Sequence, residues 1–273
     1  MPELPEVETT RRGVEPHLIG KTVLEVIVRH RGLRLPVPDS LDDLAGNRFT
    51  AVRRRAKYLI LDLERSGSLI VHLGMSGSLR IADPAADFKK HDHIAITLDS
   101  GRQLRYHDPR RFGLLIHIPQ GDPLLHPLLA QLGPEPLEKD FTPKHLAAAC
   151  SSRSAAIKLV IMDPKVVVGV GNIYASEALF RARIRPDAEA RSLSKPRLGK
   201  LVIAIREVLS DSINQGGTTL RDFLHSDGQP GYFRQRLFVY ERKNEPCRVC
   251  GTPIRHAVMG QRSTYWCPKC QKP

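Results

Sequence analysis

Four cysteines near the C-terminal end of the sequence constrain the fold more than any other feature. Cys247 and Cys250 form one Cys-x2-Cys pair, Cys267 and Cys270 form a second, and 16 residues separate the pairs. Each pair can direct two thiolates at one ion, and the intervening residues suit a β-hairpin. We therefore predict one zinc ion with four cysteine ligands. Four thiolates leave no open coordination position, so this ion is structural and not catalytic.

The alternative to zinc in this segment is a pair of disulfides, and the expected compartment argues against it. The chain opens with no charged-then-apolar signal segment, and no apolar run approaches the roughly 20 residues of a membrane span. We therefore expect a cytoplasmic protein with no membrane partner, where disulfides are disfavoured. A segment this short still needs a cross-link to fold, and a bound zinc ion supplies one without disulfides. The fifth cysteine, Cys150, stands in a predicted helix and is expected to be buried.

The charge of the chain indicates a polyanionic partner. Its 273 residues contain 42 Lys and Arg against 29 Asp and Glu, a net charge of +13. The basic residues are not one terminal tail, but cluster at residues 53–57, 110–111, 181–185 and 234–243. Such a distribution favours a polyanion-binding face, most simply for nucleic acid, although a merely basic enzyme is the alternative.

The hydrophobic pattern predicts an N-terminal helix followed by a β-sandwich. Pro5 suits the first turn of a helix over residues 5–19, and Gly20 suits its end. Short segments rich in apolar and β-branched residues then follow, separated by turn residues, with no helical period between them. These predicted strands cover residues 24–28, 49–52, 58–63, 69–73, 94–98 and 103–106.

Beyond residue 118 the pattern becomes helical. Residues 119–143 carry six prolines and read as a linker. One predicted helix starts at Pro143, and three more cover residues 155–162, 172–182 and 195–213. Residues 218–235 are predicted to form a long loop around a short helix. The fold class is therefore α+β and multidomain. We predict a β-sandwich domain over residues 1–133, a helical domain over 134–237 and a zinc hairpin over 238–273.

The start of the chain, Met1-Pro2-Glu3, could itself be an active site. A small residue after Met1 favours removal of the methionine, which would leave Pro2 with a free secondary amine. Such an amine attacks an aldehyde carbon to give an iminium, a permanent cation that assists β-elimination beside it. Glu3 would place a carboxylate one peptide away for proton transfer. The alternative is that a proline-rich start has no function.

Several motifs resemble one known family in order and from end to end. They are PELPEVET at the start, RRAKYL around Lys57, HLGMSGSLR at 72–80, DPRRFG at 108–113, VGVGNIYASEALF at 168–180 and the final QRST-to-CPKCQK segment. The chain resembles bacterial formamidopyrimidine-DNA glycosylases. The related endonuclease VIII branch shares the Pro-Glu start and the zinc hairpin, but it usually has glycine where this chain has Leu4.

The resemblance implies a fold, an activity and a set of catalytic residues. The expected architecture is a β-sandwich, a helix–two-turns–helix domain and a zinc finger. The expected activity, by a monomer on damaged double-stranded DNA, is excision of oxidised purines such as 8-oxoguanine and formamidopyrimidines, followed by strand cleavage. Pro2 would be the nucleophile, Glu3 the proton carrier and Lys57 a proton donor, while Arg262 would bind the phosphate that leaves in δ-elimination. The alternative for Lys57 is an ordinary phosphate-binding lysine.

The resemblance also implies residues that contact DNA. Met75, Arg110 and Phe112 match the trio that fills the gap left by a flipped nucleotide; the alternative for Met75 and Phe112 is the apolar core. By the same resemblance, His91, Arg153 and Asn172 contact DNA phosphates. We also expect Lys158 and residues 217–235 to contribute to the lesion pocket, and Asp92 and His93 to have structural roles.

Two further expectations concern single residues near helix and loop ends. Asn172 follows a glycine-rich stretch and can cap the helix that begins there, which would by itself explain its presence. Glu241 departs from the family, whose members often have glycine at this position. An acidic group there would weaken a nearby phosphate contact.

Two other functions are compatible with parts of the sequence. A non-catalytic DNA-binding zinc protein would explain the charge, the cysteines and the helical domain, but not Pro2 and Glu3 together with Lys57. An endonuclease VIII-like glycosylase for oxidised pyrimidines would share the chemistry and differ in the excised base.

Overall fold

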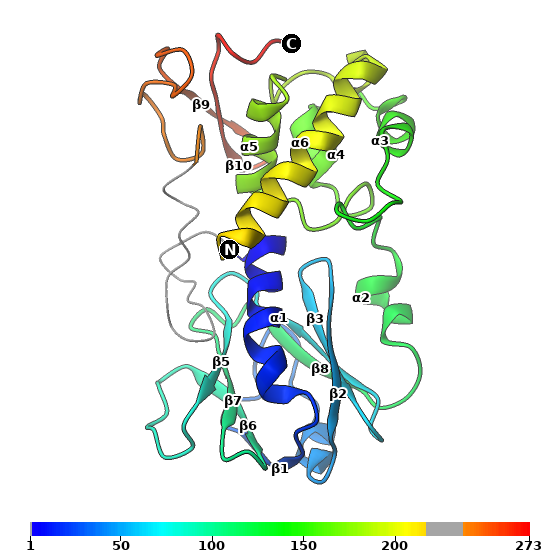
Figure 1. Ribbon diagram of the computed structural model, residues 1–273, viewed down its shortest axis with the longest axis vertical. Coiled ribbons are helices and arrows are strands. Elements are labelled where there is room, and N and C mark those ends of the chain that lie inside the picture. Colours follow the sequence, from blue (N-terminus) through cyan, green and yellow to red (C-terminus); the bar gives the residue numbers. More distant parts are fainter. Residues whose placement is uncertain (1, 217–236) are drawn as a thin grey trace. The chain divides into compact units, whose positions relative to one another are not determined.

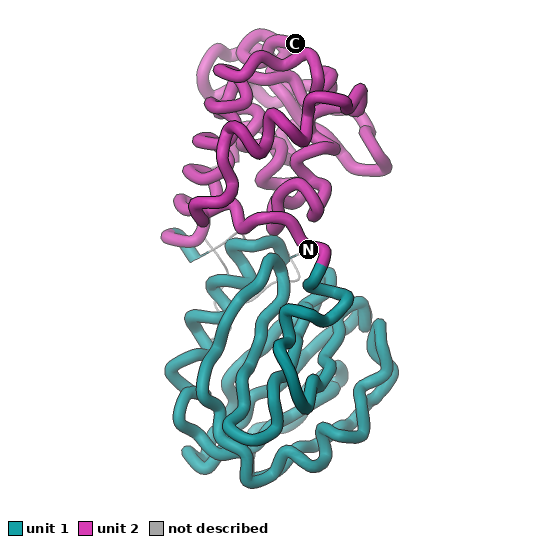
Figure 2. Tube along the Cα trace, turned by 90° about the vertical axis from the view of Figure 1, so that its right-hand side faces the viewer, with its two compact units in different colours: residues 1–130, 215–234 teal, residues 131–214, 235–273 magenta. Residues whose placement is uncertain are grey.

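The computed structural model describes residues 2–216 and 237–273 (Figure 1). The predicted loop at 217–235 and the first part of the basic cluster at 234–243 therefore lie outside the described residues. The chain divides into two compact units (Figure 2). The first contains residues 1–130, and the second contains residues 131–214 together with the C-terminal segment.

Helix α1 (Leu4–Leu18) confirms the predicted N-terminal helix. Pro5 lies in its first turn, where a missing N–H costs no hydrogen bond. The chain leaves the helix through Gly20, whose φ of 75° is a conformation that glycine adopts without strain. Val7, Val14 and other apolar residues recur on one face of α1 and are buried against the sandwich.

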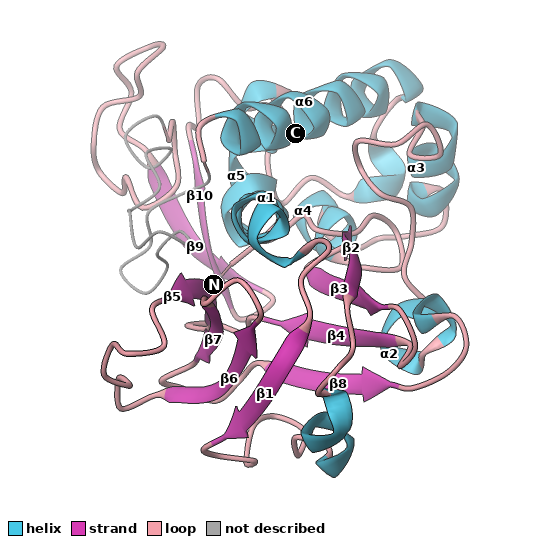
Figure 3. Ribbon diagram, turned by 60° about the horizontal axis from the view of Figure 1, so that its bottom comes forward, coloured by secondary structure: helices cyan, strands magenta, loops and turns pink. Residues whose placement is uncertain are grey.

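Two antiparallel four-stranded sheets form the predicted β-sandwich (Figure 3). One sheet has the order β1 (Val23–Val28), β6 (Asp92–Leu98), β7 (Gln103–His107) and β5 (Ser78–Ala82). The other has the order β2 (Phe49–Arg55), β3 (Tyr58–Leu63), β4 (Ser68–His72) and β8 (Leu114–Ile118). The sequence prediction omitted β5 and β8. Apolar residues of both sheets and of α1 form one continuous core.

Short helical turns interrupt the connections of the first unit. A 3₁₀ helix, η1 (Asp39–Leu44), buries Leu41 and Leu44 between β1 and β2. The proline-rich stretch that reads as a linker contains η2 (Pro123–Leu125) and α2 (Pro127–Ala130). This stretch is therefore structured where its prolines occupy first-turn positions.

The second unit combines helices with the C-terminal hairpin. Its helices are α3 (Pro143–Cys150), α4 (Ile157–Met162), α5 (Asn172–Arg181), η3 (Ala190–Ser192) and α6 (Lys195–Asn214). Thr142 caps α3 through a hydrogen bond from the His145 N–H, and Cys150 is buried as predicted. The hairpin pairs β9 (Arg255–Met259) with β10 (Arg262–Trp266). None of the helices in the described residues is long and apolar enough to cross a membrane.

A buried carboxylate on α5 fixes the segment that leads into the hairpin. Glu177 is fully inside the unit, and its oxygens accept the backbone N–H groups of Phe238, Val239 and Tyr240 at 2.8–2.9 Å. Burial raises the pKa of Glu177 despite these three bonds. Phe180 on the same helix packs with Val239, Ile254 and buried cysteines in a small apolar cluster. The hairpin is thus attached to α5 by both polar and apolar contacts.

Candidate active site and nucleic-acid interface

Pro2 and Glu3 lie immediately before α1, and both are buried. Glu3 is the N-cap residue of the helix, and its backbone N–H donates to the Glu6 carboxylate at 2.8 Å. The carbonyl of Glu3 accepts the first helical hydrogen bond from Val7 at 3.1 Å. The proposed nucleophile is therefore next to a residue held by a helix cap, and not on a frayed terminus.

Lys57 lies in the tight turn between β2 and β3. The preceding residue, Ala56, has a φ of 55°, which an alanine adopts only under constraint from its surroundings. Arg54 supplies part of that constraint, because its Nη1 donates to the Ala56 carbonyl at 3.0 Å. Arg54, on the strand β2 that leads into this turn, thus stabilises the turn that carries Lys57.

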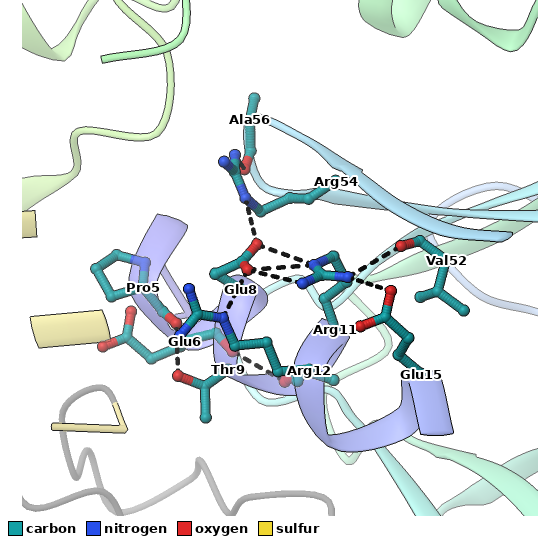
Figure 4. A network of polar contacts seen from close by, with 11 residues as sticks. Pro5, Glu6, Glu8, Thr9, Arg11, Arg12, Glu15, Val52, Arg54 and Ala56 are labelled. Carbon is teal, nitrogen blue, oxygen red and sulfur yellow. Dashed lines mark hydrogen bonds and ion pairs between the residues drawn. The ribbon is translucent and has the colours of Figure 1, made fainter. Parts of the chain in front are cut away.

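Glu8 joins the turn that carries Lys57 to the N-terminal helix (Figure 4). Its carboxylate accepts from Arg54 Nε at 3.1 Å and from Arg12 Nε at 2.9 Å, and it pairs with Arg11 at 3.1 Å. Burial opposes ionisation of Glu8, but hydrogen bonds from Arg11 and Arg12 outweigh it, and the pKa of Glu8 is lowered. Arg11 also donates to the Val52 carbonyl on β2 at 3.2 Å. The start of α1 and the turn at Lys57 therefore belong to one rigid frame.

The predicted trio is carried by two adjoining turns, which we call the paired turns: residues 74–77 hold Met75, and residues 108–113 hold Arg110 and Phe112. Asp108, fully buried, connects them. One carboxylate oxygen accepts from Ser76 Oγ at 2.8 Å, and the other accepts from the Gly113 N–H at 2.8 Å.

Two glycines allow the paired turns to touch through their backbones. A Cβ at Gly74, whose φ is 64°, would come within 2.4–2.5 Å of backbone atoms of Phe112 and Gly113. A Cβ at Gly113 would come within 1.8 Å of the Tyr106 hydroxyl. A side chain at Gly74 would force the turns apart, and one at Gly113 would displace the Tyr106 hydroxyl, so both positions require glycine.

The side chains of the trio point away from the core. Phe112 is 47% exposed, and the Arg110 guanidinium lies 4.8 Å from its ring centre. Met75 and Phe112 line one open hollow of about 560 Å³. The core alternative for Phe112 is therefore wrong.

His72 supports the turn that carries Met75. Its Nδ1 accepts the Gly74 N–H at 3.0 Å, which requires that this nitrogen be unprotonated. Burial, together with the nearby positive charges of Arg34 and Lys57, lowers the pKa of His72 to about 4. His72 is therefore neutral at physiological pH and serves as an acceptor.

His91 lies at the end of the loop between β5 and β6. Its ring packs edge-on against His93 and His107, with ring centres 6.0–6.1 Å apart. Asp92 is fully buried and accepts from His107 Nδ1 at 2.8 Å, while His93 Nε2 donates to the Asp108 carbonyl at 2.8 Å. Both side chains are therefore held by hydrogen bonds within the first unit, in agreement with the structural roles expected for them.

In the second unit a buried lysine joins Asn172, one of the predicted phosphate-binding residues, to the C-terminal hairpin. Lys158 Nζ donates to Asn172 Oδ1 at 2.6 Å, to Thr264 Oγ1 at 2.6 Å and to the Ser263 carbonyl at 3.1 Å. Asn172 Nδ2 donates to the same carbonyl at 2.9 Å. Arg262, exposed at the start of β10, is adjacent to these partners.

The contacts of Lys158 and Asn172 correct two predictions. Asn172 is the first helical residue of α5, and the N-cap residue is Gly171, so the side chain of Asn172 does not cap the helix. Its amide is instead engaged by Lys158 and Ser263. Lys158 is fully buried in the packing between α4, α5 and β10, which does not support the prediction that it lines a lesion pocket.

Arg153 follows α3 and pairs with Asp163 at 2.9 Å. Its side chain remains 39% exposed, so it can still reach a phosphate. Glu241 has a φ of 58°, in the left-handed region that favours glycine. A glycine, which the resemblance leads us to expect at this position, would adopt this conformation without strain.

The four cysteines fit a zinc ion. Their sulfur atoms all lie within 4.8 Å of one another, with Cys247 to Cys270 at 3.9 Å and Cys250 to Cys267 at 3.5 Å. Thiolates bound to one zinc at about 2.3 Å in a tetrahedron lie about 3.8 Å apart. All five cysteines of the chain are free of disulfides. The zinc holds the hairpin that carries Arg262 and supplies no open position for chemistry.

A β-sandwich with a capped N-terminal helix, a helical unit and a four-cysteine hairpin defines a class of DNA glycosylases. Three family descriptions match the chain in order. The formamidopyrimidine-DNA glycosylase N-terminal domain matches residues 1–115, its H2TH domain matches 132–224, and the zinc finger found in FPG and IleRS matches 244–273.

Relatives match over their full lengths. The formamidopyrimidine-DNA glycosylases of Methylococcus capsulatus and Stutzerimonas stutzeri are each 56% identical over 273 residues, 100% of both chains. The structure of MutM (Fpg) from Thermus thermophilus is 40% identical with a TM-score of 0.88, also over 100% of both chains. The chain belongs to the formamidopyrimidine-DNA glycosylase family. It is thus a DNA glycosylase of base excision repair, and its hairpin is a zinc finger.

Removal of the zinc should abolish DNA binding before it unfolds the β-sandwich. The hairpin cannot hold its shape without metal, but it packs on α5 within the second unit and contributes nothing to the sandwich core. Metal-free protein and Cys267→Ser should both lose affinity for duplex DNA while the strand signal in circular dichroism persists. Cys150→Ser, which changes a cysteine outside the cluster, is the control. Unchanged affinity in metal-free protein would contradict this role.

Protonation of His72 should destabilise the fold in a defined pH window. Because the pKa of His72 is lowered to about 4 in the folded state, the unfolded chain takes up this proton first as pH falls from about 6.5. Stability is thus fully present above pH 6.5 and falls toward pH 4, by up to about 3 kcal/mol from this group. Urea unfolding of His72→Gln should show a shallower decline across this window, whereas the exposed His17→Gln should match wild type. Identical declines in all three proteins would refute the assignment.

Proposed function

We propose that this chain excises oxidised purines, such as 8-oxoguanine and formamidopyrimidines, from duplex DNA through an imine at Pro2. It then cleaves the strand by β,δ-elimination. The observation that carries the proposal is the frame around Glu8, which joins the Pro2-Glu3 start of α1 to the turn bearing Lys57. A chain of this family that fixes the N-terminal helix to the turn of a lysine has the parts that this chemistry needs: an N-terminal amine, a carboxylate at Glu3 and an ammonium at Lys57.

The proposed reaction begins with base removal. The Pro2 nitrogen forms a bond to the sugar C1′, and the electron pair of the glycosidic bond leaves with the damaged base, which takes up a proton. Opening of the sugar ring then gives the iminium, with Glu3 and Lys57 transferring the protons that this requires. Each role rests on the position of the group at the start of α1 or on the β2–β3 turn.

Strand cleavage follows from the charge of the iminium. Loss of a proton from C2′ breaks the bond to the 3′ phosphate, and a second elimination breaks the bond to the 5′ phosphate. The electron-withdrawing iminium makes both steps easier. Arg262 is proposed to bind the leaving phosphate, since a cation there stabilises the developing charge.

The DNA contacts of the proposal are supported by exposure and by relatives. The paired turns present Phe112 and Arg110 away from the core, as a gap-filling wedge requires. His91, Arg153 and Asn172 are proposed to hold phosphates. The Lactococcus lactis Fpg structure, 33% identical with a TM-score of 0.92, is a complex with DNA containing an abasic site. Another relative, MutM at 33% identity, is a complex with DNA containing carbocyclic 8-oxo-G.

One observation favours oxidised pyrimidines as a second substrate class. A further structure of the Lactococcus lactis enzyme, 32% identical, contains DNA with an oxidised pyrimidine. Parallel excision assays on 8-oxoguanine and thymine glycol duplexes test the preference. We expect faster release of 8-oxoguanine, and faster release of thymine glycol would assign the chain an endonuclease VIII-like specificity.

A retained Met1 should abolish imine formation, because it converts the Pro2 amine into an amide. Borohydride trapping on an abasic-site duplex measures the imine directly, and it should succeed only with protein that mass spectrometry shows to lack Met1. Pro2→Gly, which replaces the secondary amine with a primary amine, should retain weak trapping. Full lyase activity in protein that keeps Met1 would contradict the proposal, and a non-catalytic DNA-binding protein would trap in neither form.

Arg110→Ala should reduce discrimination of the base opposite the lesion more than it reduces abasic-site cleavage. Arg110 is exposed on the paired turns, and its donors suit the acceptors that a base exposes when its partner is flipped. Such contacts are worth about 1–3 kcal/mol, so a change of roughly tenfold or more in opposite-base preference is expected.

Excision of 8-oxoguanine opposite each of the four bases, at two salt concentrations, tests the role of Arg110. Arg111→Ala removes an arginine from the same turn and is the comparison: it should leave the base ratios unchanged, whatever it does to the salt dependence. Unchanged base ratios with a shallower salt dependence in Arg110→Ala would identify Arg110 as a phosphate contact instead.

A further inference from the structure

The loop between β5 and β6, residues 83–91, presents three basic side chains on a segment with almost no core of its own. Residues 83–87 are all exposed, and only Phe88 is partly buried before Lys89, Lys90 and His91. A loop without buried side chains has to be ordered through its backbone, whose polar groups need partners. The position of the basic residues therefore depends on whatever binds that backbone.

Arg105 on β7 binds the backbone of this loop. Its side chain is 1% exposed, and its guanidinium lies beneath the loop. Nη2 donates to the carbonyls of Asp83 at 3.1 Å and Ala86 at 2.7 Å, and Nη1 donates to that of Asp87 at 3.0 Å. Three backbone carbonyls of one loop thus converge on one planar cation.

The remaining N–H groups of Arg105 face partners on its own strand β7 and on the neighbouring strand β6. Nε donates to Gln103 Oε1 at 2.7 Å, and Nη1 lies 3.8 Å from the Asp92 carboxylate. The guanidinium also lies 4.3 Å from the ring centre of Phe88. Four of the five N–H groups of the guanidinium therefore donate hydrogen bonds, more than the three that a lysine could supply.

The ordered loop forms one wall of an open hollow of about 380 Å³. Cationic and histidine side chains dominate its lining: Arg29, His30, Lys90, His91, His93 and Arg111. The hollow also contains Asp92, but that carboxylate is fully buried and bound by Arg80, His107 and the Lys89 N–H. The accessible character of the hollow is therefore positive.

Several donors around this hollow have no partner within residues 2–216 and 237–273. Arg29 uses only Nη1, which donates to the carbonyls of Lys89 and Asp92. Arg111 uses only Nη1, which donates to His30 Nε2 at 2.7 Å. The Nε and Nη2 groups of both arginines, and the Lys90 ammonium, make no hydrogen bond in this described part of the chain. Convergent uncommitted donors of this kind suit the several oxygens of a phosphate.

We propose that this hollow holds one backbone phosphate of the DNA, and that Arg105 is the positioning residue that keeps its loop wall in place. The inference rests on the proposed function for its source of phosphate, and extends it from His91 alone to a built subsite. The Asp108 N–H donates to the His91 carbonyl at 3.0 Å, so the subsite is continuous with the paired turns.

The salt dependence of DNA binding tests the subsite. Each phosphate contact contributes about 0.9 to the slope of log affinity against log salt. Lys90→Gln should reduce the slope for an abasic-analogue duplex by about that amount. Arg102→Gln removes the same charge from an exposed position at the other end of the β6–β7 hairpin and should leave the slope unchanged. A wild-type slope in Lys90→Gln would overturn the subsite.

Arg105→Lys tests the positioning role, because it keeps the charge but cannot hold three carbonyls. It should lower affinity about tenfold and reduce the slope like Lys90→Gln, and the double variant should lose no more than Arg105→Lys alone. A purely structural role would lower the melting temperature without changing the slope. Phe88→Leu, which removes the ring that lies against both Arg105 and Arg29, should change the slope in the same direction and serves if Arg105→Lys does not fold. Wild-type slopes in both variants would overturn the role of Arg105.

The outcomes of these experiments distinguish a failure of the phosphate subsite from a failure of the proposed function. If the proposed function fails, borohydride trapping fails in every variant, including wild type. If only the subsite fails, trapping persists and all slopes are equal. Equal slopes together with a shift of histidine ring resonances on adding inorganic phosphate, lost in Lys90→Gln, would assign the hollow to a free anion and overturn the DNA assignment.

Discussion

The proposed chemistry depends on the interaction of the buried Glu8 carboxylate with the arginines around it. A chain terminus is normally among the most mobile parts of a protein, yet a nucleophilic amine must be held within a fraction of an ångström of its target. Glu8 solves this by accepting from arginines on its own helix and from Arg54 on β2. Because Arg54 also holds the carbonyl of Ala56, a single ionic group locates both the start of α1 and the turn at Lys57.

A buried ionic side chain that bonds several partners also holds each of the other proposed functional segments. Asp108 joins the paired turns, Arg105 holds the loop that ends at His91, and Lys158 joins Asn172 to the zinc hairpin. Burying an ionic group is costly unless its hydrogen-bonding capacity is used, and each of these groups bonds several partners. We interpret them as interactions that define one geometry more than they add stability. Removing one partner would leave a buried charge with unused capacity, and the attached segment would lose its position.

The sequence predicts those parts of the molecule that depend on local pattern. The cysteine spacing identified the zinc site, and the apolar strand segments identified the sandwich, although the short strands β5 and β8 were not predicted. The buried ionic centres could not be found this way. Asp108 bonds Ser76, 32 residues away, and Arg105 bonds carbonyls 18–22 residues away. Nothing in a polar residue's own neighbourhood distinguishes such a partner from a solvated side chain. Glu241 shows the intermediate case, because only its φ of 58° explains the glycine expected there.

The central claim, that the N-terminal amine is the nucleophile, is tested most directly by locating the covalent bond. Processed enzyme would be trapped on an abasic-site duplex with borohydride, digested, and analysed by peptide mass spectrometry with fragmentation. The account predicts that the reduced sugar adduct lies on the peptide beginning at Pro2, with the added mass on the proline nitrogen. An adduct on a lysine such as Lys57, with the Pro2 peptide unmodified, would contradict it.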